Sequence, residues 1–506
     1  MSEFAVEILA GFGALLDPTV MAYMVIGFLI GAFFGAMPGL TAVLAIALLL
    51  PLTYSLDVAT ALVMCASIFM AGMYAGSITA TTINIPGAPS STMTAIEGYP
   101  LMQQGYGANA LGHAALGSMI GGVIGALLLI LLTPLAARAS LLIQTPGKFS
   151  LVLFALVVIV IAQREAIPKG TVAVLLGIMI ATIGVDAMEP VARFTFGTEL
   201  LVEGIDMMPL IIGTFAISEV LAQVAEREDK RALRLDDGSL PRIARRDFLP
   251  LLSEIRAIGW VTYVKSAVIG WLIGVLPGAG GSMAAFVAYV EAQRRSRRPD
   301  LFGKGSREGI AAAESANNSM CGGAFVPMLM FGIPGDPTTA VVLGVLMING
   351  LQPGPRLLDT QLELIAPMMA ALLVSALVLI PLTLFLFGPY FIRIVSIRKA
   401  PLYSCIAVVA MVGAYVATFS IFQMVLALVF GVLAFFLRRA GYPIVTLLLG
   451  FLLGPDLEQY LRRSLSLNDG DPTILLTSPD SLFFLLLTAV FYWFMVVRRP
   501  QLPAAG

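Results

Sequence analysis

Two short motifs place hydroxyl side chains directly after a proline in otherwise apolar sequence. The first is Pro89-Ser90-Ser91-Thr92 and the second is Pro337-Thr338-Thr339. Proline fits the first turn of a helix, so each motif predicts a helix start. Free N–H groups at a helix start attract anions, and neighbouring hydroxyls can donate further hydrogen bonds. The motifs therefore predict a carboxylate site. The alternative is a plain proline kink whose hydroxyls bond the backbone.

Acids and amides cluster near the second motif. Glu314, Asn317 and Asn318 are spaced i, i+3 and i+4, so they share one helix face, and Asp336 precedes Pro337. Carboxylates repel an anionic substrate, so these residues are assigned to a cation. Amide, carboxylate and carbonyl oxygens favour Na⁺, whereas a lone buried carboxylate would suit H⁺. The alternatives are a polar clamp between helices for the first three residues and a helix cap for Asp336.

Glycine-rich breaks supply further candidates, because Gly278-Ala279-Gly280-Gly281-Ser282 could form a backbone nest for an ion or a carboxylate. No nucleotide-binding loop, catalytic constellation or cofactor site is predicted, so the chain is not expected to be an enzyme. The predicted substrate-binding residues are Pro86, Gly87, Ser90, Ser91, Thr92, Gly278, Gly280, Gly281, Ser282, Pro334, Gly335, Thr338 and Thr339. The predicted cation-binding residues are Gly39, Thr41, Asn84, Glu314, Asn317, Asn318 and Asp336.

The composition places these residues in a membrane. Of 506 residues, 58% are hydrophobic and only 12% are charged, against about 25% charged in a soluble domain. Apolar windows of about 20 residues recur along the chain and indicate a polytopic helical membrane protein. This excludes a soluble enzyme, a nucleic-acid binder and a disulfide scaffold. Cys65, Cys321 and Cys405 are expected to be buried, His113 to be a packed or interfacial residue, and Glu219 has no assigned role.

Two pairs of breaks indicate an internal repeat. Gly35-Ala36-Met37-Pro38-Gly39 matches Gly274-Val275-Leu276-Pro277-Gly278 at an offset of 239, and Ile85-Pro86-Gly87 matches Ile333-Pro334-Gly335 at an offset of 248. The apolar segments 40–52 and 280–292 each reach only about 20 Å, too short to span the bilayer. They are predicted to be the second limbs of re-entrant hairpins, and each Ile-Pro-Gly motif is predicted to break a spanning helix near its middle.

The distribution of Lys and Arg along the chain predicts that the two repeats are inserted into the membrane in opposite orientations. Arg138 is the first Lys or Arg of the chain. The long hydrophilic stretch 226–259 contains many Lys and Arg residues and is therefore placed in the cytoplasm. The N-terminus is then periplasmic and the C-terminus cytoplasmic. The predicted fold is an all-α polytopic protein with inverted-topology repeats, Pro-Gly-broken helices and about 11 crossings plus two hairpins. The predicted segments are repeat 1 (1–110), connecting helices (111–225), the cytoplasmic loop (226–259), repeat 2 (260–355) and C-terminal helices (356–506).

The paired motifs also carry a resemblance that covers essentially the whole chain. In the first half of the chain the motifs are Met37-Pro38-Gly39-Leu40-Thr41 and Ile85-Pro86-Gly87-Ala88-Pro89. In the second half they are Leu276-Pro277-Gly278-Ala279-Gly280, Gly332-Ile333-Pro334-Gly335-Asp336-Pro337 and Asn349-Gly350-Leu351-Gln352-Pro353-Gly354-Pro355. Together they resemble the large membrane subunit of bacterial tripartite tricarboxylate transporters, the TctA family. The resemblance implies an inner-membrane carrier for citrate or related carboxylates, driven by a Na⁺ or H⁺ gradient. It also implies two partners, a small membrane subunit and a periplasmic substrate-binding protein. The competing interpretation is a channel or standalone exporter that needs no binding protein.

Overall fold

The computed structural model describes residues 2–163, 166–225, 245–394 and 399–497. The helices of the first half are α1 (Ser2–Ala14), α2 (Pro18–Ala36), α3 (Ala42–Thr53), α4 (Val58–Ile83), η1 (Pro89–Ser91), α5 (Thr92–Gln103), α6 (Gly107–Leu141), α7 (Thr145–Ala162), α8 (Ile167–Ala181), η2 (Glu199–Leu201), α9 (Met207–Ile211), η3 (Ile212–Ile217) and α10 (Ser218–Ala225). Those of the second half are η4 (Arg245–Phe248), α11 (Leu252–Ile258), α12 (Trp260–Val275), α13 (Gly280–Arg295), η5 (Pro299–Leu301), α14 (Arg307–Phe331), α15 (Pro337–Ile348), α16 (Pro355–Thr360), α17 (Leu362–Val374), η6 (Ser375–Leu379), α18 (Ile380–Ile394), α19 (Lys399–Thr418), α20 (Ile421–Arg439), α21 (Ile444–Ser466), α22 (Ile474–Thr477), α23 (Pro479–Tyr492) and η7 (Trp493–Val497). One two-stranded sheet joins β1 (Gly184–Val185) to β2 (Ala192–Arg193).

The prediction of an all-α polytopic membrane protein is confirmed. Within the described residues, nine helices are long and apolar enough to cross a bilayer. The predicted count of about 11 crossings places α2 in a hairpin, so it takes eight of these nine helices together with α8, α14 and α19, which are shorter or more polar. The count stays a prediction. Basic residues of the predicted cytoplasmic loop at 226–244, together with Arg398, Arg498 and Arg499, lie outside the described residues.

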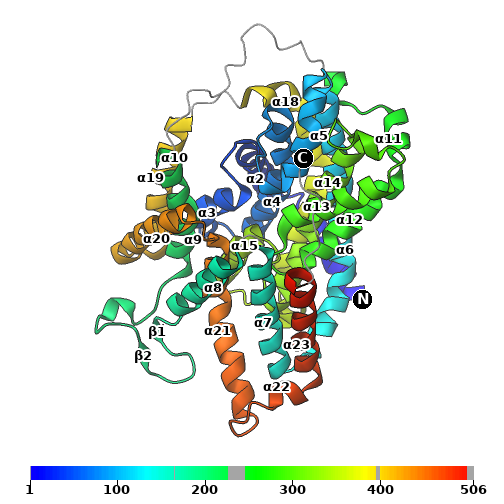
Figure 1. Ribbon diagram of the computed structural model, residues 1–506. Coiled ribbons are helices and arrows are strands. Elements are labelled where there is room, and N and C mark those ends of the chain that lie inside the picture. The colour runs from blue at the N-terminus through cyan, green and yellow to red at the C-terminus, as the bar shows by residue number, and fades with distance from the viewer. Residues whose placement is uncertain (1, 164–165, 226–244, 395–398, 498–506) are drawn as a thin grey trace.

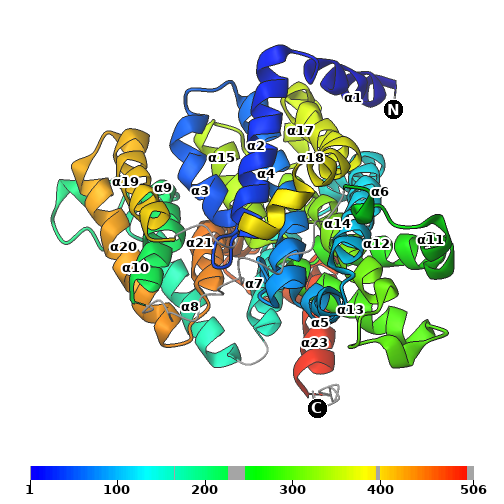
Figure 2. The same ribbon diagram turned by 90° about the horizontal axis from the view of Figure 1, so that it is seen from above.

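Helices α4 and α14 occupy the middle of one bundle. Helix α2 packs on α4 and α12 packs on α14, while α6 lies along α14 and α17 lies along α4. A second group lies to one side, where α8 packs on α21 and α20 packs on the run from α9 to α10 (Figures 1 and 2). The connection that holds β1 and β2 projects from this second group in Figure 1.

Glycines let the helices of the central bundle touch backbone to backbone. A Cβ on Gly31 would lie 2.4 Å from the Ile68 carbonyl oxygen, and one on Gly121 would lie 2.0 Å from the Ser315 oxygen. Such distances leave no room for a side chain, so larger residues would push the helices apart. Glycines at intervals of four residues, Gly27/Gly31/Gly35 and Gly117/Gly121/Gly125, therefore form the close-packing faces of α2 and α6.

The two pairs of breaks have matching local geometry. Asn84 and Gly332 both end a helix in the left-handed region, at φ 58° and 67°. The next amide bridges back in the same way, from Ile85 to the Thr79 oxygen and from Ile333 to the Pro327 oxygen. The hairpin breaks also agree, because the Met37 amide bonds the Phe34 oxygen and the Leu276 amide bonds the Ile273 oxygen. At these residues, the sequence matches at offsets of 239 and 248 thus correspond to similar backbone conformations.

Matching contacts continue in the peripheral helices. A Cβ on Gly177 of α8 would lie 2.0 Å from the Leu447 oxygen of α21, and one on Gly450 of α21 would lie 2.2 Å from the Val174 oxygen of α8. A Cβ on Gly213 of η3 would lie 2.4 Å from the Ala427 oxygen of α20. Close glycine-mediated pairs therefore join both α8 to α21 and η3 to α20, beyond the segments 1–110 and 260–355.

Two expectations differ from the structure. Cys405 is exposed, because it lies on the outer face of the peripheral helix α19, whereas Cys65 and Cys321 are buried as expected. Neither Ile-Pro-Gly break falls near the middle of one helix, because α4 alone has 26 residues and α14 alone has 25. The Gly87 amide instead donates to the Gly76 oxygen at 3.2 Å, so the chain folds back along α4 before α5 begins.

Candidate functional site

The start of α5 carries two buried hydroxyls. Pro89 opens the short helix η1, which runs directly into α5, as the proline motif predicts. Ser90 and Ser91 are buried, and neither Oγ has a hydrogen-bond partner in the described part of the chain. Ser91 Oγ lies 2.5 Å from the position that a Cβ on Gly76 would take, so Gly76 leaves space for this hydroxyl. Two unsatisfied donors therefore point from a helix start into the protein interior.

The start of α13 meets these serines. A Cβ on Gly281 would lie 2.9 Å from Ser90 Cβ, 2.7 Å from Asn317 Oδ1 and 2.4 Å from Met73 Cε. The fold therefore brings together a helix start from each half of the chain and an amide of α14. We call Ser90, Ser91, Gly281, Asn317 and Asp336 the central cluster.

The two asparagines are held by their nitrogen atoms. Asn317 Nδ2 donates to the Met73 oxygen and Asn318 Nδ2 donates to the Met70 oxygen, each at 3.1 Å. Both Oδ1 atoms are buried and have no partner among the residues that the structure describes. A buried acceptor without a donor costs about 1–3 kcal/mol. A cation or a donor group of a substrate would remove that cost.

Asp336 caps α15. Its carboxylate accepts the Thr338 amide at 2.8 Å, and its own amide donates to Thr339 Oγ1 at 3.0 Å. Thr339 Oγ1 in turn donates to the Asp336 carbonyl oxygen. The Thr338 hydroxyl and the Gly281 amide also bond the Asp336 carboxyl, so this acid sits at the starts of both α15 and α13. The hydroxyls predicted to bind substrate in repeat 2 are thus committed to Asp336 and its backbone, unlike those of Ser90 and Ser91.

Glu314 has partners that sequence reasoning missed. Its fully buried carboxyl bonds the hydroxyls of Thr94 in α5 and of Ser118 in α6, the latter at 3.0 Å. Thr94 lies three residues after Ser91, so the sequence alone indicates that the two side chains share one helix face. No sequence pattern connects Ser118 to Glu314, because they lie 196 residues apart.

The other predicted site residues have separate surroundings. Thr41 caps α3, Asn84 is an exposed C-cap of α4, and the exposed Thr92 donates to the Pro89 oxygen. A Cβ on Gly39 would lie 2.6 Å from Gln223 Nε2, and Gln223 in turn bonds Glu219. Gly278 packs on Ile159, Gly87 on the Gly35 oxygen and Gly335 on the Gly274 oxygen, which gives these glycines a packing role. Ser282 is exposed.

The segments around the central cluster provide no basic side chain that could bind an anionic ligand. The segments 58–106, 276–293 and 308–348, which supply the cluster and its neighbours, contain no Lys, Arg or His. An anion there would be held by helix N-termini and hydroxyls, and a cation by amide and carboxylate oxygens. His113 lies outside these segments and is packed against Glu254, with Nε2 3.2 Å from the carboxylate, as its interpretation as a packed residue predicts. Glu219 pairs with Arg438.

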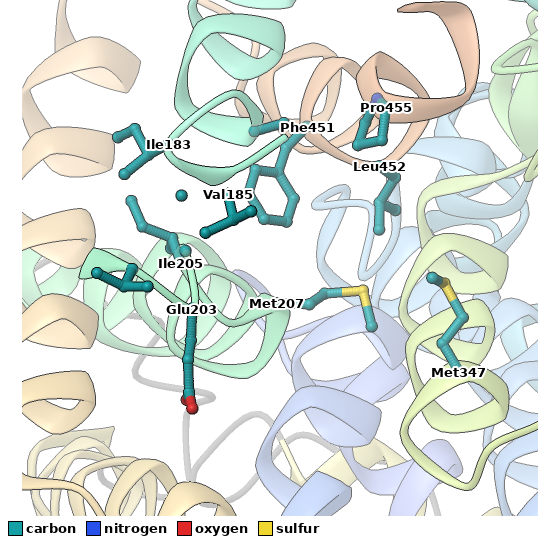
Figure 3. A pocket seen from close by; sticks show the side chains of 13 residues that line it. Ile183, Val185, Glu203, Ile205, Met207, Met347, Phe451, Leu452 and Pro455 are labelled. Atoms are coloured by element: carbon teal, nitrogen blue, oxygen red, sulfur yellow. The ribbon is translucent and has the colours of Figure 1, made fainter. Parts of the chain in front are cut away.

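A separate hollow of about 410 Å³ lies between the α8–α9 connection, α21 and the end of α15 (Figure 3). Apart from Glu203, the residues that line it are apolar or glycine, among them Ile183, Phe451 and Met347. Met347 is ten residues after Pro337, about 15 Å along the helix. A hollow whose charged lining residue is an acid suits a carboxylate poorly, so the central cluster is the better candidate.

One family model matches most of the chain. Residues 21–449 match the tripartite tricarboxylate transporter TctA family. An uncharacterised 52.8 kDa protein in the TAR-I ttuC′ 3′ region of Agrobacterium vitis is 32% identical over 484 residues, which cover 95% of this chain and 93% of that protein. An uncharacterised protein in the TAR-II ttuC′ 3′ region of the same organism is 37% identical over 210 residues, 42% of this chain and 86% of that protein. No solved structure matches the chain.

Proposed function

Because the chain belongs to the tripartite tricarboxylate transporter TctA family, we propose that it is the permease subunit of a secondary transporter that takes up tricarboxylates or related carboxylates. The observation that carries this proposal is the pair of unpartnered, buried hydroxyls of Ser90 and Ser91 at the start of a helix. A substrate carboxylate would accept hydrogen bonds from both hydroxyls. The helix dipole would favour its charge where no basic side chain does.

The test is uptake into inner-membrane vesicles that hold this chain and its small membrane subunit. Labelled citrate and related carboxylates are offered with and without the periplasmic substrate-binding protein. Uptake that requires the binding protein supports the proposal. Transport at the same rate without it would favour the alternative, a channel or standalone exporter.

The proposal includes inverted repeats, with the N-terminus in the periplasm and the C-terminus in the cytoplasm. The matched breaks after α4 and α14 support two equivalent units, and the uneven charge supports opposite insertion. In such carriers one unit rocks against the other around a fixed site, so the central cluster would face each side in turn.

Topology labelling tests this arrangement. On a background without Cys65, Cys321 and Cys405, a cysteine at Ser55 is expected to react with an impermeant reagent from the periplasm, and one at Arg297 from the cytoplasm. Ser55 is chosen because it is exposed, whereas the neighbouring Asp57 caps α4. Reaction of both sites from the same side would contradict opposite insertion.

Coupling to Na⁺ is the second part of the proposal. The Oδ1 atoms of Asn317 and Asn318 and the carboxylate of Asp336 are the proposed cation ligands, supported by the absence of other partners for both amide oxygens among the described residues. Asp336→Asn keeps a good N-cap residue but removes the charge. It is expected to raise the Na⁺ concentration for half-maximal uptake by roughly tenfold, about 1.4 kcal/mol, with a smaller change in substrate affinity. Uptake is measured against Na⁺ concentration in both proteins.

An unchanged Na⁺ response would leave Asp336 with its capping role alone. Uptake driven by a pH gradient without Na⁺ would replace Na⁺ with H⁺, and Glu314 would then be the proposed proton carrier. Its carboxyl joins α14 to Thr94 of α5, so a change in its protonation would reach the helix that holds Ser90 and Ser91. Glu314→Gln separates the two cases, because only the H⁺ carrier requires a titratable group there.

A further inference from the structure

One buried carboxylate is not used by the proposed site. Glu97 of α5 is fully buried and accepts four hydrogen bonds. Tyr289 Oη and the Gly303 amide donate to Oε1, each at 2.6 Å. The Gly305 and Ser306 amides donate to Oε2, at 2.9 and 2.7 Å. All four donors lie in the second half of the chain, so this single side chain ties α5 to α13 and to the turn at 303–306.

The hydrogen bonds of Glu97 lie further along α5 and α13 than the central cluster does. Helices α5 and α13 meet at their starts, where Ser90 lies beside Gly281. They meet again at Glu97 and Tyr289, seven and eight residues further on, about 11 Å from the cluster. The two helices therefore run side by side from the cluster to the end of the molecule that holds Arg294, Arg295 and Arg307.

The space between the two helices is filled by a small apolar group. Tyr289, Ala292 and Phe302 pack together with Ala312, and Met93 of α5 lies against them. Met93 precedes Glu97 by one helical turn and shares its face. A solute that moved from the cluster to the basic end between α5 and α13 would have to displace Met93 and break the bonds of Glu97.

The opposite end of the molecule is closed differently. At the offset of 248 that relates the two halves, the counterpart of Glu97 is Val345 of α15. Helix α15 packs on α3, whose sequence AVLAIALLLPLT is apolar apart from its last residue. Apolar contacts slide without loss of specific bonds, whereas a buried carboxylate that loses its donors is costly. The polar closure is thus specific to the basic end.

We propose that Glu97 is the latch of a gate between α5 and α13, which closes the path from the central cluster to the basic end of the molecule. The inference rests on the proposed function, because it takes the central cluster as the substrate site. In the closed state the carboxylate is fully bonded. Opening separates α5 from Tyr289 and the 303–306 turn, and water then replaces the four donors. The latch therefore favours the state in which substrate cannot leave toward the basic end.

The test measures accessibility and needs no substrate. A reporter cysteine replaces Met93 in a protein without Cys65, Cys321 and Cys405, and an impermeant thiol reagent is applied to vesicles of each orientation. Glu97→Gln places an amide NH₂ against backbone donors, so the gate should open more often. From the side of Arg297, the labelling rate of the reporter is expected to rise at least about tenfold, as expected for the loss of a hydrogen bond to a charged group. From the other side it should not rise.

Two further variants exclude a general loosening of the fold. Glu308→Gln is the matched control, because Glu308 Oε2 bonds Ser296 Oγ at 2.6 Å within the second half alone and does not reach α5. It should leave the labelling rate unchanged. Tyr289→Phe removes one donor only and should give a smaller rise than Glu97→Gln. Equal labelling in wild type and both latch variants, or an equal rise in the control, would overturn the latch. Failure of carboxylate uptake with the predicted labelling pattern would instead count against the proposed substrate.

Discussion

Gly281→Val is expected to abolish carboxylate uptake while the protein still inserts and folds. A Cβ at this position would lie 2.7 Å from Asn317 Oδ1 and 2.9 Å from Ser90 Cβ, so a valine side chain would fill the centre of the cluster. Overpacking costs about 1–3 kcal/mol of folding stability even where neighbours can move. The loss of uptake is expected for a separate reason, because the valine side chain occupies space that the substrate needs. Initial uptake rates in vesicles with the binding protein measure the effect.

The matched control is Gly13→Val. Gly13 lies in α1, and a Cβ there meets open space. Both variants add the same side chain to a glycine of the same protein, so they differ in location alone. Uptake near the wild-type rate in Gly281→Val, with normal amounts of protein in the membrane, would place the substrate site elsewhere.

Removal of the unpartnered hydroxyls is expected to weaken substrate binding strongly. Ser90→Ala and Ser91→Ala each remove a buried donor that has no partner among the described residues. If each hydroxyl donates to a charged carboxylate, its loss costs about 1.5–3 kcal/mol, roughly 10- to 150-fold in apparent affinity. Because neither hydroxyl bonds the protein, folding stability should change little. Uptake against substrate concentration gives the affinity, and thermal unfolding in detergent gives the stability.

Ser77→Ala provides the comparison. Ser77 is also buried in this part of α4, but its hydroxyl donates to the Tyr74 oxygen of its own helix at 2.7 Å. Its replacement should leave the apparent affinity within about twofold of wild type. Thr339→Ala should behave differently again, because this hydroxyl belongs to the cap of α15 and its loss costs about 0.5–2 kcal/mol of stability. Normal affinity in both Ser90 and Ser91 variants would contradict a site at the start of α5.

The sequence alone determined the environment, the places where the helices break and the family. A chain with 12% charged residues cannot cover a water-exposed surface, so membrane insertion follows from composition. Pro86 and Pro334 with their following glycines break helices for local steric reasons, and the structure has breaks at both places. Repetition of these local signals at fixed offsets predicted that the two halves are equivalent units.

Only the tertiary structure decided which polar groups meet. Ser90 lies beside Gly281, and Glu97 is bonded by residues about 200 positions later in the chain. Asp336 and Thr339 bond each other, whereas Ser90 and Ser91 are left unpartnered in the described structure, although both motifs have a hydroxyl after proline. Residue spacing fixes which side chains share a helix face, but it carries no information on how two distant helices are placed. That placement follows from the close approach of glycine-lined backbones such as Gly31 to Ile68 and Gly121 to Ser315, and it decides which buried hydroxyls and carboxylates find a partner.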